Sequence, residues 1–321
     1  MTAQLPQTSR AANPQPTADR ATTVAPVGVL YILVSGACFG LLPWFARVAY
    51  SHGADPFGML AARFTFACTI LLVVRVVRMR RAPWPTRTLF TKLFLLGAVG
   101  YAPQATFFFN GVKRIDTSLA TVIFYTYPVL VVIAGWLVFR HRPSRTTTLC
   151  LAVAVAGAVL TAGQVGAGTL AGVLFMFAAA CWYTGYILAS SRVVRNVDSL
   201  TSITVVMVGA ALAHLVILGL TDSHLPADGR GWLAALGAAF FSTVIAMGFF
   251  FAGVRIVGPG EAAVLSTIEP VVSILVGITA LHESLGAARV VGAAMVLASV
   301  TVLARSSVPE GDGTAQRNSE R

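Results

Sequence analysis

Two residues that each stand directly before a proline could carry the chemistry of this chain: Glu269, followed by Pro270, and Tyr127, followed by Pro128. Glu269 is the one acidic residue near the middle of any long apolar run. Proline removes a backbone donor, so it kinks or locally unwinds a helix and frees carbonyls toward a cavity. An acid and a phenol at two such breaks are suited to binding a cationic or amino group beside an aromatic or aliphatic side chain. The alternative is that Glu269 only hydrogen-bonds a neighbouring helix.

The polar residues near Glu269 recur at helical spacing. Ser266, Glu269 and Ser273 are three and seven residues apart, so a helix presents all three on one face. Arg63 lies within another apolar run, and three roles remain open for it. It could bind a substrate carboxylate, pair with Glu269, or extend along apolar surface to the lipid headgroups.

Two further groups of side chains share helical faces. Tyr101, Gln104 and Phe108 lie on one face of their run, and Trp182 and Tyr186 are four residues apart in another. Aromatic residues at this spacing serve either core packing or binding, and those with polar atoms need a partner when buried. All five are candidates for the wall of a substrate site.

The patterns that enzymes and pumps use are missing from the sequence. It contains no HExxH zinc motif and no P-loop, and its aspartates are scattered over loops and tails instead of clustering for Mg²⁺. Cys38, Cys68, Cys150 and Cys181 form no CxxC pair, and we expect them to pack as small apolar residues. We therefore predict no catalytic residue, no metal and no cofactor.

The elements that must position these residues are long apolar helices. A hydrophobic content of 56%, a charged content of 11% and a mean hydropathy of +0.78 exclude a soluble protein. Ten apolar runs are each long enough to cross a hydrocarbon layer of about 30 Å as a helix, and their continuity excludes a β-barrel. We expect an all-α integral membrane protein with ten transmembrane helices, at about 27–49, 57–77, 89–111, 117–139, 146–164, 169–190, 200–220, 232–252, 260–281 and 286–304.

The net charge of +11 comes from an uneven distribution of the 23 Lys and Arg residues. If the N-terminus is inside, most of them fall in the inner loops and tails, including the segment RVVRMRRAPWPTR at 75–87. By the positive-inside rule, this predicts a multi-pass protein of the bacterial plasma membrane with both termini in the cytoplasm. The basic loops would contact anionic lipid, and no nucleic acid is expected as a partner. The polar ends, 1–25 and 305–321, are predicted to be disordered tails.

A long segment of the chain occurs twice. Residues 107–138 align without a gap to residues 249–280, with ten of the 32 positions identical. Pro128 aligns with Pro270, and Tyr127 aligns with Glu269. Repeated apolar segments with broken helices are typical of secondary transporters.

The repeat divides the chain into two five-helix halves, 26–164 and 169–304, joined by a turn at 165–168. Because five is odd, the second half starts from the opposite side of the membrane, so the two repeats are inverted. Such a pair supports alternating access, with Pro128 and Pro270 as the gating kinks. We expect the central cavity between the third, fourth, eighth and ninth helices.

The fifth and tenth helices are rich in Ala, Gly and Val. Each carries a pair of small residues four apart, Ala152 with Ala156 and Ala288 with Gly292. Such pairs allow close helix packing, either within a monomer or between the subunits of a homodimer.

Several of these segments together resemble the drug/metabolite transporter (DMT) superfamily, EamA type. The segment GEAAVLSTIEPVVSILVGITALHES is similar to the family's hallmark helix, which ends in an acid, here Glu283. Its first-repeat counterpart is TSLATVIFYTYPVLVVIAGWL, MLAARFTFACTILLV resembles the Arg-bearing second helix, and FAAACWYTGYILASSR resembles the sixth. One position departs from the pattern, because His141 stands where the first repeat often has an acid.

This resemblance implies ten helices in two EamA repeats and the export or exchange of small metabolites, often amino acids. We therefore predict a secondary transporter of small metabolites such as amino acids, with proton coupling as one option. The alternative function is efflux of drugs and amphipathic cations by the same fold. A membrane-embedded enzyme is a weaker alternative, because the metal-binding motifs are missing.

Overall fold

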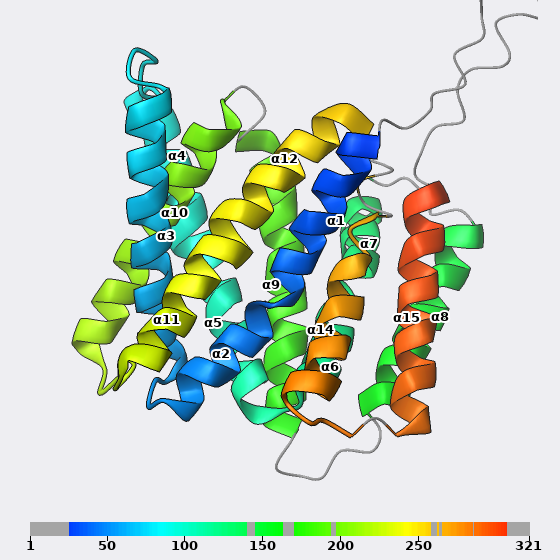
Figure 1. Cartoon of the computed structure of the whole chain (residues 1–321). Helices are drawn as coiled ribbons and strands as arrows, with labels where there is room; N and C mark the ends of the chain where they lie inside the picture. The colour runs from blue at the N-terminus through cyan, green and yellow to red at the C-terminus, as the bar shows by residue number, and fades with distance from the viewer. Residues whose placement is uncertain are drawn as a thin grey trace, which may run out of the picture.

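The chain forms a bundle of helices standing side by side (Figure 1). The computed structural model describes residues 26–139, 145–162, 170–193, 197–257, 262, 265–284 and 286–306. Within these ranges the regular elements are helices. The segment 1–25, residues 307–321, the turn at 165–168 and His141 lie outside the described residues.

The helices of the first half follow one another with short connections. They are α1 (Pro26–Gly40), α2 (Leu42–Ser51), α3 (Pro56–Arg78), α4 (Arg87–Leu95), the π-helical η1 (Leu96–Tyr101), α5 (Ala102–Arg114), α6 (Thr117–Phe124), α7 (Tyr127–Phe139) and α8 (Arg145–Ala162). The second half contains α9 (Leu170–Val193), α10 (Ser199–Leu220), α11 (Gly229–Ala239), the π-helical η3 (Phe240–Ile245), α12 (Ala246–Val257), α14 (Ile268–Ala280) and α15 (Ala287–Ser306).

Each of the ten predicted runs is mainly helical where the structure describes it, and short turns interrupt the first, fourth and ninth runs. In the part of the chain that the structure describes, five helical stretches are long and apolar enough to cross a membrane: Pro26–Ser51, Pro56–Arg78, Leu170–Ser190, Ser199–Leu220 and Gly229–Val257. Shorter apolar helices cover the fourth, fifth, ninth and tenth runs: Thr117–Val131, Thr148–Gly157, Ile268–Ala280 and Val290–Val302. The third run consists of α4, η1 and α5.

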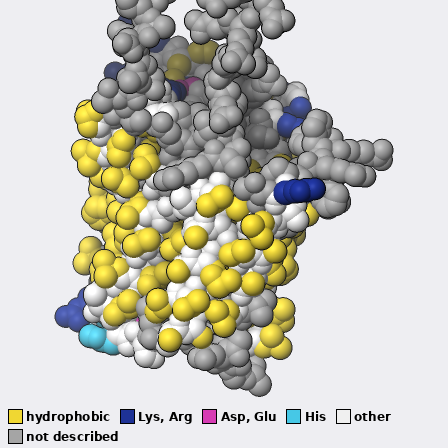
Figure 2. All heavy atoms as spheres, turned by 90° about the vertical axis from the view of Figure 1, so that its right-hand side faces the viewer, with side chains coloured by type: hydrophobic (Ala, Val, Ile, Leu, Met, Phe, Trp, Pro, Cys, Tyr) yellow, Lys and Arg dark blue, Asp and Glu magenta, His cyan; other side chains and the backbone are white. Residues whose placement is uncertain are grey.

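The lateral surface of the bundle is apolar. Figure 2 shows the side where α8 and α15 lie, with hydrophobic side chains over its middle and Lys or Arg side chains near its upper and lower edges. Leu149, Val155, Val290 and Val302 are among the exposed hydrophobic residues on these two helices. A contiguous apolar band between charged edges is the surface that a lipid bilayer covers.

The two halves are broken at corresponding places. The third and eighth runs each contain a π-helical segment, η1 and η3, directly before the helix that carries the repeated phenylalanines. The fourth run is interrupted by a turn at 125–126, and the ninth by a turn at 266–267. Pro128 and Pro270 therefore lie in the first turns of α7 and α14. π-Helical segments inside α-helices, such as η1 and η3, often mark functional sites.

Helices of one half pack mainly on helices of the other. The principal contacts join α1 to α12, α5 to α9, α3 to α10, and α8 to α15. In the two halves α1 corresponds to α9, and α5 corresponds to α12. Exchanging the halves therefore converts the α1–α12 contact into the α5–α9 contact, and it leaves the α3–α10 and α8–α15 contacts unchanged. This set of contacts is the one that a two-fold relation between the halves produces.

One residue of the two predicted small-residue pairs, Gly292, lies at a helix contact. A Cβ on Gly157 would come within 2.7 Å of the Gly292 carbonyl oxygen, so α8 and α15 approach closely at this point. Gly292 is buried there, whereas Ala152 and Ala156 face outward. Gly292 thus packs against α8 within the chain.

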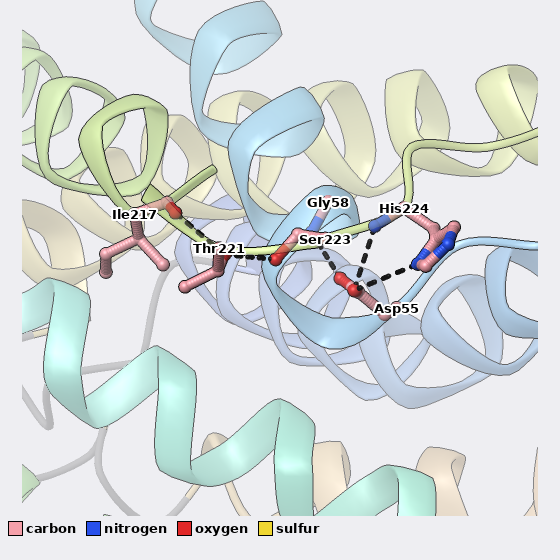
Figure 3. Close-up of polar contacts among 6 residues, drawn as sticks. All are labelled: Asp55, Gly58, Ile217, Thr221, Ser223 and His224. Carbon is pink, nitrogen blue, oxygen red and sulfur yellow. Dashed lines mark hydrogen bonds and ion pairs between the residues drawn. The ribbon is translucent and has the colours of Figure 1, made fainter. Parts of the chain in front are cut away.

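One end of the bundle, at the bottom of Figure 1, contains the connections 51–56, 114–117, 220–229 and 280–287; we call it the α2–α3 end. A hydrogen-bonded seam joins the two halves there (Figure 3). The Asp55 carboxylate accepts hydrogen bonds from the backbone N–H groups of Gly58 (2.7 Å) and His224 (2.9 Å), and the Asp55 N–H donates to the His224 carbonyl (3.0 Å). Asp55 thereby caps α3 and fixes the α10–α11 loop.

The same loop is shaped by further contacts. The Thr221 hydroxyl donates to the Ile217 carbonyl at 2.7 Å and lies 2.5 Å from the Ser223 hydroxyl (Figure 3). Asp228 caps α11 by accepting from the Gly231 N–H at 3.0 Å, and His52 Nδ1 lies 2.8 Å from its other oxygen. The Gly231 hydrogen bond, aided by His52, holds the pKa of Asp228 below its ordinary range.

Candidate functional site

A cavity of about 110 Å³ lies among the broken helices. Its wall combines one acid, one arginine, hydroxyl groups and many aromatic rings. The lining residues are Phe39, Leu42, Pro43, Arg63, Tyr101, Gln104, Ala105, Phe108, Phe109, Thr121, Phe124, Tyr125, Tyr127, Tyr183, Glu269 and Ser273. Apolar walls with a few convergent polar groups are typical of small-molecule sites.

The ninth run contributes Glu269 and Ser273 through a close contact with α1. A Cβ on Gly40 would come within 2.6 Å of the Glu269 carbonyl oxygen, so glycine permits the approach of the two helices. The Ser273 hydroxyl donates to the Gly40 carbonyl at 2.8 Å. Since α1 ends at Gly40 and α2 begins at Leu42, this carbonyl is available where the first run breaks.

The turn at 125–126 places two phenols beside the acid. The Tyr125 hydroxyl donates to the Ser266 carbonyl oxygen at 3.5 Å, and the Tyr125 side chain lines the cavity together with Glu269. Tyr127, at the start of α7, also lines the cavity. The residues that align in the two repeats, Tyr127 and Glu269, therefore belong to the same cavity wall.

Tyrosine and phenylalanine rings form an aromatic wall along the cavity, and Tyr186, which does not itself line the cavity, packs on two of them. Tyr183 lies edge-on to Tyr127 with ring centroids 4.9 Å apart, and it is 5.5 Å from Phe124. Tyr186 stacks on Tyr183 at 5.8 Å and contacts Tyr101 at 5.6 Å. Such rings give a rigid surface for the apolar part of a ligand and keep hydroxyl groups available for hydrogen bonds.

Arg63 is fully enclosed, with 1% of its surface exposed, and lines the cavity. Its Nη2 donates to the Thr243 hydroxyl at 3.0 Å. The guanidinium lies 5.0 Å from the Phe64 ring centroid and 5.5 Å from that of Phe109. A side chain that is buried to this degree does not extend to the lipid headgroups, so this alternative for Arg63 is excluded. Within the described residues, the ion pairs are His52 with Asp228 and His224 with Asp55, so Arg63 does not pair with Glu269.

Six of the candidate residues line the cavity: Arg63, Tyr101, Gln104, Phe108, Tyr127 and Glu269. Ser266, Trp182 and Tyr186 do not. The Ser266 hydroxyl, in the turn at 266–267, donates to the Ala262 carbonyl at 2.8 Å. Trp182 is 42% exposed, and its indole N–H donates to the Val99 carbonyl at 3.1 Å in a separate, open depression that Tyr186 also lines.

The position of the cavity differs in part from the expected one. The third, fourth and ninth runs do contribute, but no cavity-lining residue comes from the eighth run, and the first, second and sixth runs supply the rest. The reason is the break at Gly40, which brings α1 and α2 against α14 and places Phe39, Leu42 and Pro43 in the wall.

Sequence reasoning missed Tyr125 and Tyr183. Tyr183 follows Trp182 directly, so it lies about 100° around the helix and faces the cavity while Trp182 faces outward. Tyr125 lies in the turn before Tyr127, where helical spacing does not apply. For Tyr125, the available signal was the segment FYTYP, in which two tyrosines stand just before Pro128. No group of three possible metal ligands occurs in the described part of the chain.

Comparison with known proteins identifies the family. A model of the EamA-like transporter family matches residues 26–163 and again residues 170–305. The chain therefore belongs to the EamA-like transporter family. It is an all-α, multi-pass membrane protein and a secondary transporter of the drug/metabolite transporter kind.

Similar proteins are described as transporters, and the similarity covers nearly the whole length of each of them. The uncharacterized transporter YwfM of Bacillus subtilis (strain 168) is 24% identical, covering 89% of this chain and 96% of the relative. The uncharacterized transporter YcbK of the same organism is 23% identical, over 86% and 92%. An uncharacterized transporter of Archaeoglobus fulgidus is 25% identical, over 86% and 95%. A solved crystal structure shares the fold, with a TM-score of 0.62 and 21% identity over 88% of this chain and 98% of that one.

Proposed function

We propose that the protein exports or exchanges small metabolites such as amino acids by alternating access of its two halves, 26–164 and 169–304. In this proposal it lies in the bacterial plasma membrane with both termini in the cytoplasm, so the α2–α3 end faces outward. The distribution of Lys and Arg supports this orientation. The pairwise packing of α1 with α12 and of α5 with α9 supports a two-fold relation between the halves.

The observation that carries the proposal is the position of Glu269 in a cavity wall shared by both halves. Glu269 and Ser273 come from the second half, whereas Tyr101, Tyr125 and Tyr127 come from the first. Secondary transporters bind their substrates at such repeat interfaces, next to discontinuous helices. An ionisable residue within a membrane span is functional by default, because burying its charge is costly.

Glu269 has two possible roles in transport. It could exchange a proton for the substrate, or it could remain an anion that holds an amino group. The two roles differ in their dependence on the proton gradient. Proton exchange predicts that transport follows an imposed pH gradient, whereas a permanent anion predicts transport that depends little on it.

Efflux of amphipathic cations is the second candidate function. The aromatic wall around Tyr183 and the acid Glu269 favour it, because rings and carboxylates both attract cations. The buried cation Arg63 in the same wall opposes it, since a second positive charge would be repelled in a low-dielectric cavity.

A counterflow screen of the purified full chain in proteoliposomes tests the proposal. Vesicles preloaded with an unlabelled compound accumulate the labelled form of that compound only if it is a substrate. We expect exchange of one or more L-amino acids above empty vesicles, and no exchange of tetraphenylphosphonium or ethidium. Exchange of these cations without any amino acid would contradict the proposal in favour of the second candidate. The same vesicles with an imposed pH gradient separate the two roles of Glu269.

A further inference from the structure

Arg63 is a buried cation whose hydrogen-bonding capacity is mostly unused. A guanidinium carries five N–H donors and no acceptor. In the described structure one of them reaches a partner, the Thr243 hydroxyl at 3.0 Å, and Nε has no hydrogen-bond partner although it is buried. The two phenylalanine rings beside it provide cation–π attraction but accept no in-plane hydrogen bonds.

Arg75, on the same helix α3, shows what a structurally satisfied buried arginine looks like. It is 2% exposed. Its Nε donates to the Thr201 hydroxyl at 2.8 Å, Nη1 to the Met79 carbonyl at 2.8 Å, and Nη2 to the carbonyls of Ala82 and Pro83. The Arg75 guanidinium also lies over the Trp84 ring, and Arg75 is not among the residues that line the cavity. Arg63 has none of these carbonyl partners.

The charge of Arg63 is also without a counter-ion among the described residues. Removing a cation from water without a paired anion costs several kcal/mol, so an unpaired buried arginine requires compensation. Arg63 borders the cavity, so a molecule bound there would lie next to the guanidinium.

We infer that Arg63 binds the carboxylate of the transported molecule and makes the transporter selective for carboxylate-bearing substrates. This inference rests on the proposed function. The planar fork of the guanidinium matches a carboxylate in a bidentate pair. A phosphate would bring more negative charge into a cavity of about 110 Å³ that already contains Glu269. Because Arg63, Glu269 and tyrosine rings line one cavity, the preferred substrate is a zwitterionic amino acid with an aromatic or aliphatic side chain.

Thr243 acts as the positioning residue of this subsite. It lies in the π-helical segment η3 and donates its own hydroxyl hydrogen to the Ala238 carbonyl at 3.3 Å. That leaves its oxygen lone pairs free to accept from Arg63. The eighth run therefore contributes to the site through Arg63, although no residue of this run lines the cavity.

The test compares L-amino acids with their amides, which lack the negative charge but keep the amino group and side chain. We expect wild-type proteoliposomes to exchange at least one acid about tenfold or more faster than its amide. Arg63→Gln should lose this acid preference by about tenfold or more, and Arg63→Lys should keep part of it. Thr243→Val should raise KM for the acid with a smaller effect on kcat. Arg78→Gln, which changes an exposed arginine of the same helix, should preserve the preference.

Several results would overturn the inference. They include equal exchange of acid and amide by the wild type, and an unchanged preference in Arg63→Gln. If Arg63→Gln is not monodisperse in detergent, the acid preference is measured in Arg63→Lys and Thr243→Val instead, and an unchanged preference in both variants would overturn the inference. If the wild type exchanges neither acids nor amides, the proposed function fails. Thermal stabilisation by acetate that is present in the wild type and weaker in Arg63→Lys and in Thr243→Val would still support the subsite. No acetate effect in the wild type would then overturn the inference too.

Discussion

The Glu283 carboxylate holds Ser118 through two hydrogen bonds, one from the backbone N–H at 2.9 Å and one from the hydroxyl at 2.6 Å. Its other oxygen accepts from the Thr117 N–H at 2.6 Å. Glu283 follows α14 in the second half, whereas Thr117 and Ser118 begin α6 in the first half. The acid thus caps a helix of the other repeat, where the partial positive charge of the helix N-terminus favours an anion.

Replacing Glu283 by Gln should destabilise the protein by about 1–3 kcal/mol, because the charge-assisted hydrogen bonds to α6 are lost. The melting temperature of the detergent-purified protein, followed by loss of the monodisperse fraction on heating, should fall by several degrees. Asp222→Asn changes an exposed acid at the same end of the bundle and should leave the melting temperature unchanged. Equal melting temperatures for Glu283→Gln and wild type would show that the cap contributes nothing.

Gly277→Ala should disrupt the same contact sterically. A Cβ at this position would lie 2.6 Å from Glu283 Oε2 and 2.7 Å from Ser118 Oγ, so the carboxylate must move. We expect a loss of about 1–3 kcal/mol, and less than additive losses when the change is combined with Glu283→Gln. Gly185→Ala is the matched control, since a Cβ there meets no atom within 4 Å. Additive losses in the double variant would argue against a shared contact.

The stability contribution of Asp228 should depend on pH. Its pKa is lowered in the folded protein, first by the Gly231 N–H and then by His52, so its contribution is present above the ordinary value of 3.8. That contribution is lost as the pH falls through the lower folded value. Asp228→Asn keeps a capping side chain but removes the charge. The variant should be less stable than wild type at neutral pH, and the difference should shrink below pH 3.8. A difference that is constant with pH in thermal melts would contradict this assignment.

Single cysteines test the orientation of the bundle. In a variant without Cys38, Cys68, Cys150 and Cys181, a cysteine at Ser51 or Asp222 should react with a membrane-impermeant maleimide added to intact cells. A cysteine at Thr88, exposed at the start of α4, should react only after the cells are opened. Labelling of Thr88→Cys in intact cells would reverse the proposed orientation.

The sequence predicted the helical runs well, because membrane spans need long apolar stretches that composition reveals directly. It also predicted that Glu269, Tyr127 and Arg63 would be candidates, and the structure brings all three to one cavity. These residues were recognisable because a charge or a broken helix is rare in an apolar run. The contact between Gly40 and Glu269 was not predictable, because the approach of α1 to α14 depends on packing between the halves.

The outward position of Trp182 could not be predicted either. Helical spacing shows that Trp182 and Tyr186 share a face, but not which neighbour that face meets. In the structure α9 turns the adjacent Tyr183 into the cavity and leaves the Trp182 indole on Val99 at the surface. Pairing with Glu269 was an open alternative for Arg63, and the structure excludes it among the described residues.

The central claim is that Glu269 is the working acid of a transport site between two inverted halves. Its most direct test is counterflow by Glu269→Gln, which keeps the size and hydrogen-bonding shape of the side chain but removes its charge. For the amino acid that wild-type proteoliposomes exchange best, we expect Glu269→Gln to lose roughly tenfold or more of the rate while it remains monodisperse and membrane-inserted. Asp222→Asn should exchange at the wild-type rate. Near-normal counterflow by Glu269→Gln would contradict the account and leave Glu269 with a structural role.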